Sequence, residues 1–408
     1  MRLLILYHSN ILPPKPGADE HIYTTAKLLA GPYDVTVLTW GLGKPKRFED
    51  TNLKIIHLGN DSEAVTTTKH WKIPDYIADI LSYTGIRYIP FLHKARGPSI
   101  KQFNKLNLGF FDIAIRISYN NNKILKYLNK FHGTKTLEFT LVSGLPHYLN
   151  NKNKWLEYTN SSSALSSRAM DIVYKIMNKI VFWFYVSSLS SRDVIAVSEY
   201  DKLILEKIKV LNVRYIPPLH NFGPQLEITV DQDSILFFSG NNLSARIAIQ
   251  YILSISTKLK NYNFYITGFI PNIIDKNNIS TNLHLCGFLD EKEFHELIGK
   301  SGIIIMPLIS GTGIQTKVTE AMHWSKPIIT TSVIASEFND IKNGIHMLIE
   351  DDPDEFVNKI KLLMENPKLR SDISENARKY YNEHLSPESA LNIHLQYLKE
   401  IMKGEINN

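Results

Sequence analysis

The most informative motif of this chain occupies residues 306–322, which read Met306-Pro307-Leu308-Ile309-Ser310-Gly311-Thr312-Gly313-Ile314-Gln315-Thr316-Lys317-Val318-Thr319-Glu320-Ala321-Met322. An apolar run, Gly302 to Met306, leads into the motif and predicts a buried strand. A Gly-x-Gly loop, Gly311 to Gly313, follows the strand and opens directly into a helix. Glycines let the backbone approach a ligand closely, and the free N–H groups at a helix start favour an anion such as a phosphate.

Glu320 lies inside the helix that follows this loop, where its carboxylate can accept hydrogen bonds from ligand hydroxyls. A site for a phosphate and a diol together predicts a nucleotide-sugar as the ligand. The candidate donor contacts are Gly311, Gly313, Ile314, Gln315, Thr316, Lys317 and Glu320. Two alternatives stay open: Glu320 is a solvated acid near the helix dipole, and Lys317 pairs with a carboxylate on the neighbouring turn.

The composition is that of a soluble enzyme, because the 408-residue chain is 44% hydrophobic and 21% charged and is long enough for two domains. Its net charge of +6 is spread along the chain without a basic tail, so we expect no nucleic-acid partner. The single cysteine, Cys286, excludes an internal disulfide and a cysteine metal site. The apolar start Met1–Tyr7 is too short for a signal peptide, and no run reaches the roughly 18 residues that span a bilayer. We therefore expect a cytoplasmic protein.

Short apolar strands alternate with helical patterns along the chain, which predicts an α/β protein with parallel sheets. In the first half the predicted strands are Leu3–Tyr7, Val35–Thr39, Lys54–Leu58, Asp112–Ile117, Thr136–Phe139, Val194–Val197 and Val213–Ile216. The predicted helices there are His21–Leu29, Asn121–Lys130, Ala169–Leu189 and Asp201–Leu205. A second series consists of strand Ile235–Ser239, helix Arg246–Leu259 and strands Phe264–Thr267, Leu283–Cys286, Ile303–Met306 and Pro327–Thr330.

Between the two series lies a segment rich in structure-breaking residues, Pro217–Pro224, which we interpret as the start of an interdomain linker. Two Rossmann-like halves joined by a hinge place a ligand in the cleft that faces the carboxyl ends of both sheets. The acidic run Glu350–Glu355 predicts a helix start rather than a metal site. Asp352 is a preferred cap, and Pro353 suits the first helical position.

These motifs together resemble the GT-B glycosyltransferases, specifically the large retaining family 4, also called the group 1 transferases. The segment Gly311–Met322 is similar to the family's Glu-x7-Glu region, and Lys326–Thr331 continues the likeness. Upstream, Ile195–Glu199 looks like the last strand of the family's first domain, and Ile216-Pro217-Pro218 occupies its Ile-Pro-Asn position. Similar positions downstream are Asn343-Gly344, Phe356, Leu362-Leu363, Asn366-Pro367, Leu369-Arg370 and Asn376-Ala377-Arg378.

The resemblance implies a GT-B fold, in which two Rossmann-like domains face each other across a cleft and a C-terminal helix returns toward the first domain. It implies an acceptor-side domain at residues 1–217, a linker at 218–234, a nucleotide-sugar-binding domain at 235–385 and the returning helix at 386–408. Glu320 matches the second glutamate of the family motif, which binds ribose hydroxyls in relatives, and Gly313 matches the cradle for the diphosphate. Thr312 stands where the first glutamate is expected, which leaves a hydroxyl beside the donor sugar.

Other implied site residues lie elsewhere in both domains. Relatives often place an Arg and a Lys after the strand equivalent to 235–239; here Gly240 follows that strand and Arg246 is the one cation kept. Glu337 matches a polar position of the family.

On the acceptor side, relatives have a first loop with paired glycines, of which this chain keeps Gly17, followed by His21. Many relatives carry a His or Asp after a later strand, where this chain offers Glu138 and His147. The candidate catalytic residues are therefore Glu138, His147 and Thr312. A structural role is the alternative for both histidines.

We expect sugar transfer from a nucleotide-diphosphate sugar to a hydroxyl of a glycan or lipid-linked acceptor, with retention implied by the resemblance. Fixed N–H donors and cations can stabilise the departing diphosphate, so we expect neither a cofactor nor a metal. The segment Lys72–Lys105 holds six basic and two acidic residues among aromatic ones, which suits peripheral contact with an anionic membrane at its cytoplasmic face. A packed helical insertion is the alternative. A nucleotide-sugar 2-epimerase of the same fold and a non-catalytic binding protein also stay open.

Overall fold

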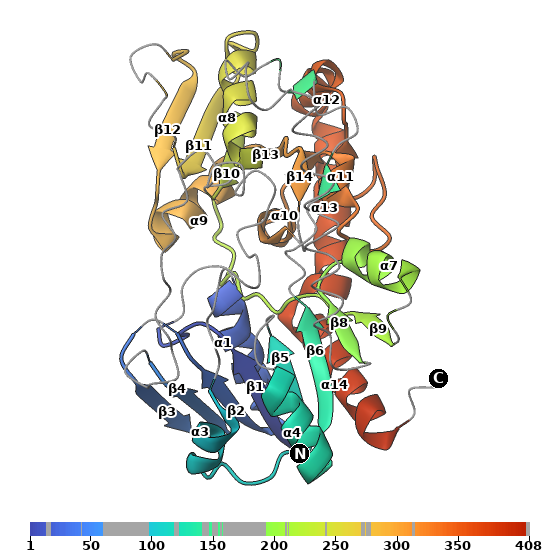
Figure 1. Cartoon of the computed structure of the whole chain (residues 1–408). Coiled ribbons are helices and arrows are strands. Elements are labelled where there is room, and N and C mark those ends of the chain that lie inside the picture. Colours follow the sequence, from blue (N-terminus) through green and yellow to red (C-terminus); the bar gives the residue numbers. More distant parts are fainter. Residues whose placement is uncertain are drawn as a thin grey trace.

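The protein is described from a computed structural model, in which two α/β domains lie one above the other (Figure 1). The described residues are all but 14–17, 42, 60–97, 118–121, 141–146, 149–153, 156, 158–192, 209, 211, 241–242, 271–273, 275–278, 312–314 and 405–408. Within them, none of the helices combines the length and the apolar character needed to cross a membrane.

The first domain is built on an eight-stranded sheet with the order β3-β4-β2-β1-β5-β6-β8-β9. The strands are β1 (Arg2–Tyr7), β2 (Asp34–Thr39), β3 (Lys46–Asp50), β4 (Leu53–His57), β5 (Ile113–Ile117), β6 (Lys135–Thr140), β8 (Val194–Ala196) and β9 (Val213–Tyr215). The helices of this domain are α1 (Ala18–Leu29), α3 (Ile100–Lys105), α4 (Asn122–His132) and α7 (Glu199–Lys207). All pairings are parallel except that of β3 with β4. The central strands are buried on both faces, which is why they read as continuous apolar runs.

The second domain repeats this architecture with a six-stranded parallel sheet in the order β12-β11-β10-β13-β15-β16. The strands are β10 (Asp231–Ser239), β11 (Asn263–Gly268), β12 (Leu283–Gly287), β13 (Ser301–Met306), β15 (Ile328–Thr330) and β16 (Leu348–Ile349). The helices are α8 (Leu243–Ser256), α9 (Glu291–Lys300), α10 (Thr316–His323), α11 (Ser332–Ala335), α12 (Pro353–Glu365) and α13 (Pro367–Tyr380).

Two chain segments connect the domains. Residues 216–230 have no regular structure, so β10 begins inside the predicted linker, which was expected to run to residue 234. At the other end, a short π-helix, Tyr381–Leu385, joins α13 to α14 (Pro387–Lys403). Helix α14 reaches back to the first domain (Figure 1), where Glu400 forms an ion pair of 2.7 Å with Arg214 on β9. The predicted returning helix is confirmed.

Most predicted strands of both domains are confirmed to within a few residues, and Asp352 caps α12 as expected, with Pro353 at its start. Strand β3 was not predicted because all five of its residues are exposed and four of them are charged. Such a sequence shows no apolar alternation, yet it suits the edge of a sheet. The predicted helix Ala169–Leu189 and most of the basic segment Lys72–Lys105 lie outside the described residues. The end of that segment is α3, which buries Phe103 in the first domain.

Candidate functional site

The loop after β13 is held by hydroxyl groups from two neighbouring elements. The Ser244 hydroxyl at the start of α8 accepts hydrogen bonds from the backbone N–H groups of Ile309 (2.9 Å) and Ser310 (3.2 Å). The Thr331 hydroxyl donates to the Leu308 carbonyl at 2.6 Å. Ser244 was not predicted as a site residue. The one local signal for Ser244 is that it follows the first strand of the domain, close to the predicted donor contact Arg246.

Gly311 sits directly over the carboxyl group of Glu337. A Cβ atom at this position would overlap Glu337 Oε1 and would approach Ile334 Cδ1 to 3.0 Å. A side chain at residue 311 would therefore force the buried Glu337 carboxyl group to shift. The backbone comes close to a buried side chain of the protein here, whereas the sequence predicted close approach to a ligand. The structure thus brings Glu337, another predicted site residue, beneath the loop.

We expect Gly311→Ala to destabilise the protein by about 1–3 kcal/mol and to weaken nucleotide binding, because the added methyl group overpacks the loop. Chemical denaturation and calorimetric titration measure the two effects. Gly240→Ala is the matched control for the stability measurement alone, since a Cβ there meets open space and should change stability by less than about 0.5 kcal/mol. Glu337→Ala should relieve the clash in the double variant; strictly additive losses would contradict this explanation.

A strand from the first domain pairs with this loop. Strand β14 (Ser310–Gly311) lies antiparallel to β7 (His147–Tyr148), with Gly311 opposite His147 and Ser310 opposite Tyr148. The backbone of His147 therefore lies beside the loop. Glu138 lies on β6, opposite Val194 of β8. The side chains of His147 and Glu138, and Gly17, Thr312, Gly313 and Ile314 entirely, fall outside what the structure describes, so their roles stay predictions.

Helix α10 begins without a side-chain cap among the described residues. Its N-cap is Gln315, whose carbonyl accepts from Val318 N–H at 2.9 Å, and the N–H groups at the start of the helix remain suited to an anion. The Thr316 hydroxyl lies 3.5 Å from Nε2 of His220 in the linker. Burial lowers the pKa of His220 to about 4, so this imidazole is neutral at pH 7. His220 is a second group at the site that was not predicted.

Glu320 and Lys317 lie on α10, half-buried and close enough for their charges to interact. Burial raises the pKa of Glu320 to about 7; Lys317 opposes this rise, and Glu20 adds to it. Glu20 belongs to α1, so Glu320 faces the first domain. Burial also lowers the pKa of Lys317, and the nearby charge of Glu320 partly offsets that lowering. A poorly solvated carboxylate beside an ammonium group is suited to bind hydroxyls next to a phosphate.

Two further carboxyl groups are buried where the domains meet. Asp201 on α7 is 2% exposed and Glu337 is fully buried. Burial raises the pKa of Asp201 to about 7. It also raises the pKa of Glu337 well above its usual value, helped by Asp201 and opposed by nearby amide groups of Gln315. The Glu199 N–H on α7 donates to the Glu337 carbonyl at 3.0 Å, which ties this pair to the domain interface.

His21, predicted at the start of a helix beside the first loop, lies on α1 and is 2% exposed. Its Nδ1 lies 3.2 Å from the Leu219 carbonyl, and its ring lies 5.4 Å from that of His220. Burial and His220 lower the pKa of His21 well below its usual value. The structure therefore places His21 against the linker as a packed, neutral side chain.

Asp19, two residues earlier, lies beside the carboxyl end of β1. Its carboxylate accepts hydrogen bonds from the Tyr7 hydroxyl at 2.9 Å and the Ser9 hydroxyl at 3.3 Å. In the second domain, Arg246 is exposed, and its guanidinium lies 5.6 Å from the centre of the Phe269 ring. Its expected contact with the donor stays a prediction.

Two Asp-x-Asp tripeptides occur in the chain, and local backbone contacts explain the first aspartate of each. Asp231 accepts from Asp233 N–H at 3.1 Å, and Asp352 accepts from Asp354 N–H at 3.0 Å. Across the described residues, no group of three or more His, Cys, Asp and Glu side chains is arranged to hold a metal ion.

Residues 233–366 match the family model described as glycosyl transferases group 1. Sucrose-phosphate synthase from Thermosynechococcus elongatus has a similar structure, with a TM-score of 0.65 and 14% identity over 99% of both chains. A TarM mutant of S. aureus in complex with fondaparinux, α-GlcNAc-glycerol and UDP gives 0.59 and 14% over 97% of this chain and 99% of its own. Anabaena HepE in complex with UDP gives 0.59 and 12% over 98% and 100%. Curated protein sequences gave no match.

The likeness over nearly the whole length, together with two parallel-sheet domains and a returning helix, defines a GT-B fold. Within this fold, residues 233–366 of the second domain are similar to the group 1 glycosyltransferases. Glycosyl transfer is the class of reaction that these findings support.

Proposed function

We propose that this protein transfers a sugar from a nucleotide-diphosphate sugar to a hydroxyl group of a glycan or lipid-linked acceptor, with retention and without a metal. The observation that carries the proposal is the start of α10 after the glycine loop, where no described side chain caps the helix, with Glu320 and Lys317 on the same helix. This arrangement combines an anion site with an acceptor for ribose hydroxyls.

The chemical difficulty of the reaction is the departure of the nucleotide diphosphate while the anomeric carbon gains positive charge. The N–H groups at the start of α10 and the ammonium group of Lys317 stabilise the departing charge in a poorly solvated site. His220, neutral beside Thr316, offers a further polar contact at the same helix end. These groups are fixed by the fold before the donor arrives, so little reorganisation is needed.

Nucleotide binding should weaken as the pH falls through about 7, because Glu320 accepts hydrogen bonds from both ribose hydroxyls only when it is ionised. Between pH 8 and pH 6 we expect the Kd for the best-binding nucleoside diphosphate to rise about five- to tenfold. Calorimetric titration measures this change. Glu320→Gln is titrated in parallel, because its pH dependence gives the part of the change in Kd that comes from protonation of the ligand itself. Equal pH profiles for the two proteins would contradict the assignment.

Acceptor-dependent turnover tests the proposed reaction. The protein is incubated with a panel of nucleotide-sugars, with and without a membrane extract as the source of acceptor. We expect release of the nucleoside diphosphate from one donor only when the extract is present. A new sugar-nucleotide formed from the donor alone would favour a 2-epimerase, and no donor turnover under either condition would favour a binding protein.

A further inference from the structure

A short segment of the first domain is built into the second. Trp155 lies in sequence between β6 and β8, yet its side chain is fully buried in the hydrophobic core of the second domain. The centroid of its ring lies 4.6 Å from the ring centroid of Tyr251 and 5.6 Å from that of Phe356. Its indole Nε1–H donates to the Asp351 carbonyl at 2.8 Å. An aromatic side chain packed in this way is a strong anchor.

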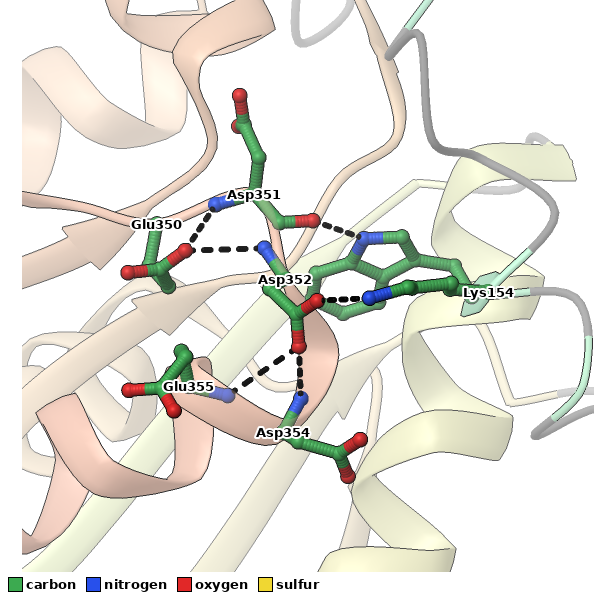
Figure 2. A network of polar contacts seen from close by, with 7 residues as sticks. Lys154, Glu350, Asp351, Asp352, Asp354 and Glu355 are labelled. Atoms are coloured by element: carbon green, nitrogen blue, oxygen red, sulfur yellow. Dashed lines mark hydrogen bonds and ion pairs between the residues drawn. The ribbon is translucent and has the colours of Figure 1, made fainter.

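The neighbouring residue Lys154 adds a second, solvent-exposed contact with the second domain, an ion pair with Asp352 (Figure 2). Asp352 is itself fixed, because it caps α12 and its N–H donates to Glu350 Oε1 at 3.0 Å. Asp351 N–H donates to the same Glu350 oxygen at 2.9 Å, as Figure 2 shows. The acidic turn Glu350–Asp352 is therefore held by its own hydrogen bonds, which do not involve Lys154.

The other end of this segment is β7, whose pairing with β14 forms a two-stranded sheet of its own. Among the described residues, β7 is the one strand that pairs with β14. Strand β14 is thus held by β7 and by the hydrogen bond from Ser310 to Ser244. His147–Tyr148 thus contact the second domain beside the glycine loop, and Lys154–Trp155 contact it at its core.

We propose that His147–Tyr148 and Lys154–Trp155, two parts of one chain segment, together position the donor site. Trp155 holds the segment on the second domain, and β7 in turn holds Ser310 and Gly311 in the shape that the donor requires. Trp155 is a positioning residue that acts through β7 and touches no substrate. The effect on donor binding rests on the proposed function, whereas the coupling between the anchor and the loop does not.

Hydrogen exchange followed by mass spectrometry tests the coupling directly. Trp155→Ala should accelerate exchange about tenfold or more at residues 147–155 and also at 308–311, and by more than in β10 of the same core, while protection in β1 of the other domain stays unchanged. If that variant fails to fold, Lys154→Glu carries the test, because Lys154 is exposed and its substitution leaves no cavity. Lys368→Glu is the matched control: it places an acid beside Asp372 in an exposed ion pair far from the segment, and it should leave the loop unchanged.

An engineered disulfide provides the corresponding rescue. Tyr148 and Ser310 are directly opposed on antiparallel strands, so Tyr148→Cys with Ser310→Cys, in a Cys286→Ser background, can form a bridge. With Trp155→Ala added, the reduced protein should bind the best of UDP, GDP and ADP about tenfold more weakly than the parent. The oxidised protein should recover both loop protection and affinity.

Faster exchange confined to residues 147–155, with the loop unchanged, would overturn the proposal, as would a disulfide that restores neither measurement. If the parent protein binds none of the three nucleotides, the proposed function fails separately. The exchange rates at residues 308–311 then still decide whether the anchor positions the loop.

Discussion

Replacing Glu320 by Gln should raise the Kd for the nucleoside diphosphate by roughly 10- to 100-fold. A carboxylate that accepts hydrogen bonds from ligand hydroxyls contributes about 1.5–3 kcal/mol, and an amide retains one acceptor atom without the charge. The side chain faces the first domain from α10 and is poorly solvated, which strengthens such bonds. Calorimetric titration against UDP, GDP and ADP measures the change.

The same substitution should leave the fold intact. Burial raises the pKa of Glu320 to about 7, so its ionised form is held at a cost that a neutral glutamine avoids. We therefore expect the variant to melt at the same temperature as the parent or slightly higher at pH 8. Glu375→Gln, on the exposed side of α13, serves as the control and should alter neither property. Unchanged nucleotide affinity in Glu320→Gln would remove the ribose contact from this account.

Neutralising the buried pair Asp201 and Glu337 should change how stability depends on pH. Both groups have raised pKa values in the folded state, so the folded protein keeps protons that the unfolded chain releases above about pH 4. The stability that these two protonated carboxyl groups contribute is fully present at low pH and is lost as the pH rises toward and beyond 7. For Asp201 alone, the shift from 3.8 to about 7 corresponds to roughly 3 kcal/mol between pH 5 and pH 8.

Between pH 5 and pH 8, the free energy of unfolding should fall by at least roughly 3 kcal/mol more in the parent than in the double variant Asp201→Asn with Glu337→Gln. Urea denaturation at pH 5 and pH 8 measures the difference. Asp372→Asn is the control, because that carboxylate is half-exposed in an ion pair and should change the pH dependence little. Parallel stability curves for the parent and the double variant would show that the pair is ionised in the folded protein.

The sequence predicted the parts of the fold that bury apolar side chains in regular patterns. The strands of both parallel sheets and the start of α12 at Asp352 and Pro353 follow from such local signals. Strand β3 was missed because an exposed edge strand of charged residues has no apolar alternation. The place of Trp155 in the second domain's core was missed for another reason: nothing near it in the sequence indicates which core a lone tryptophan enters.

The candidate site divides in the same way. Glu320, Lys317 and Gly311 were predicted because a loop and the helix after it are adjacent in sequence, and the structure brings Glu337 beneath that loop. Ser244 and His220 reach the site from elements far along the chain, so only the tertiary fold reveals their contacts. His21 was predicted at a helix start beside the first loop, and its contact with the linker follows only from the tertiary fold.

The most direct test of the central claim is a crystal structure of the protein with the nucleoside diphosphate that it binds best. The account predicts the diphosphate on the backbone N–H groups at residues 313–317 and both ribose hydroxyls on the Glu320 carboxylate. A nucleotide bound elsewhere, with the start of α10 covered by side chains, would contradict it.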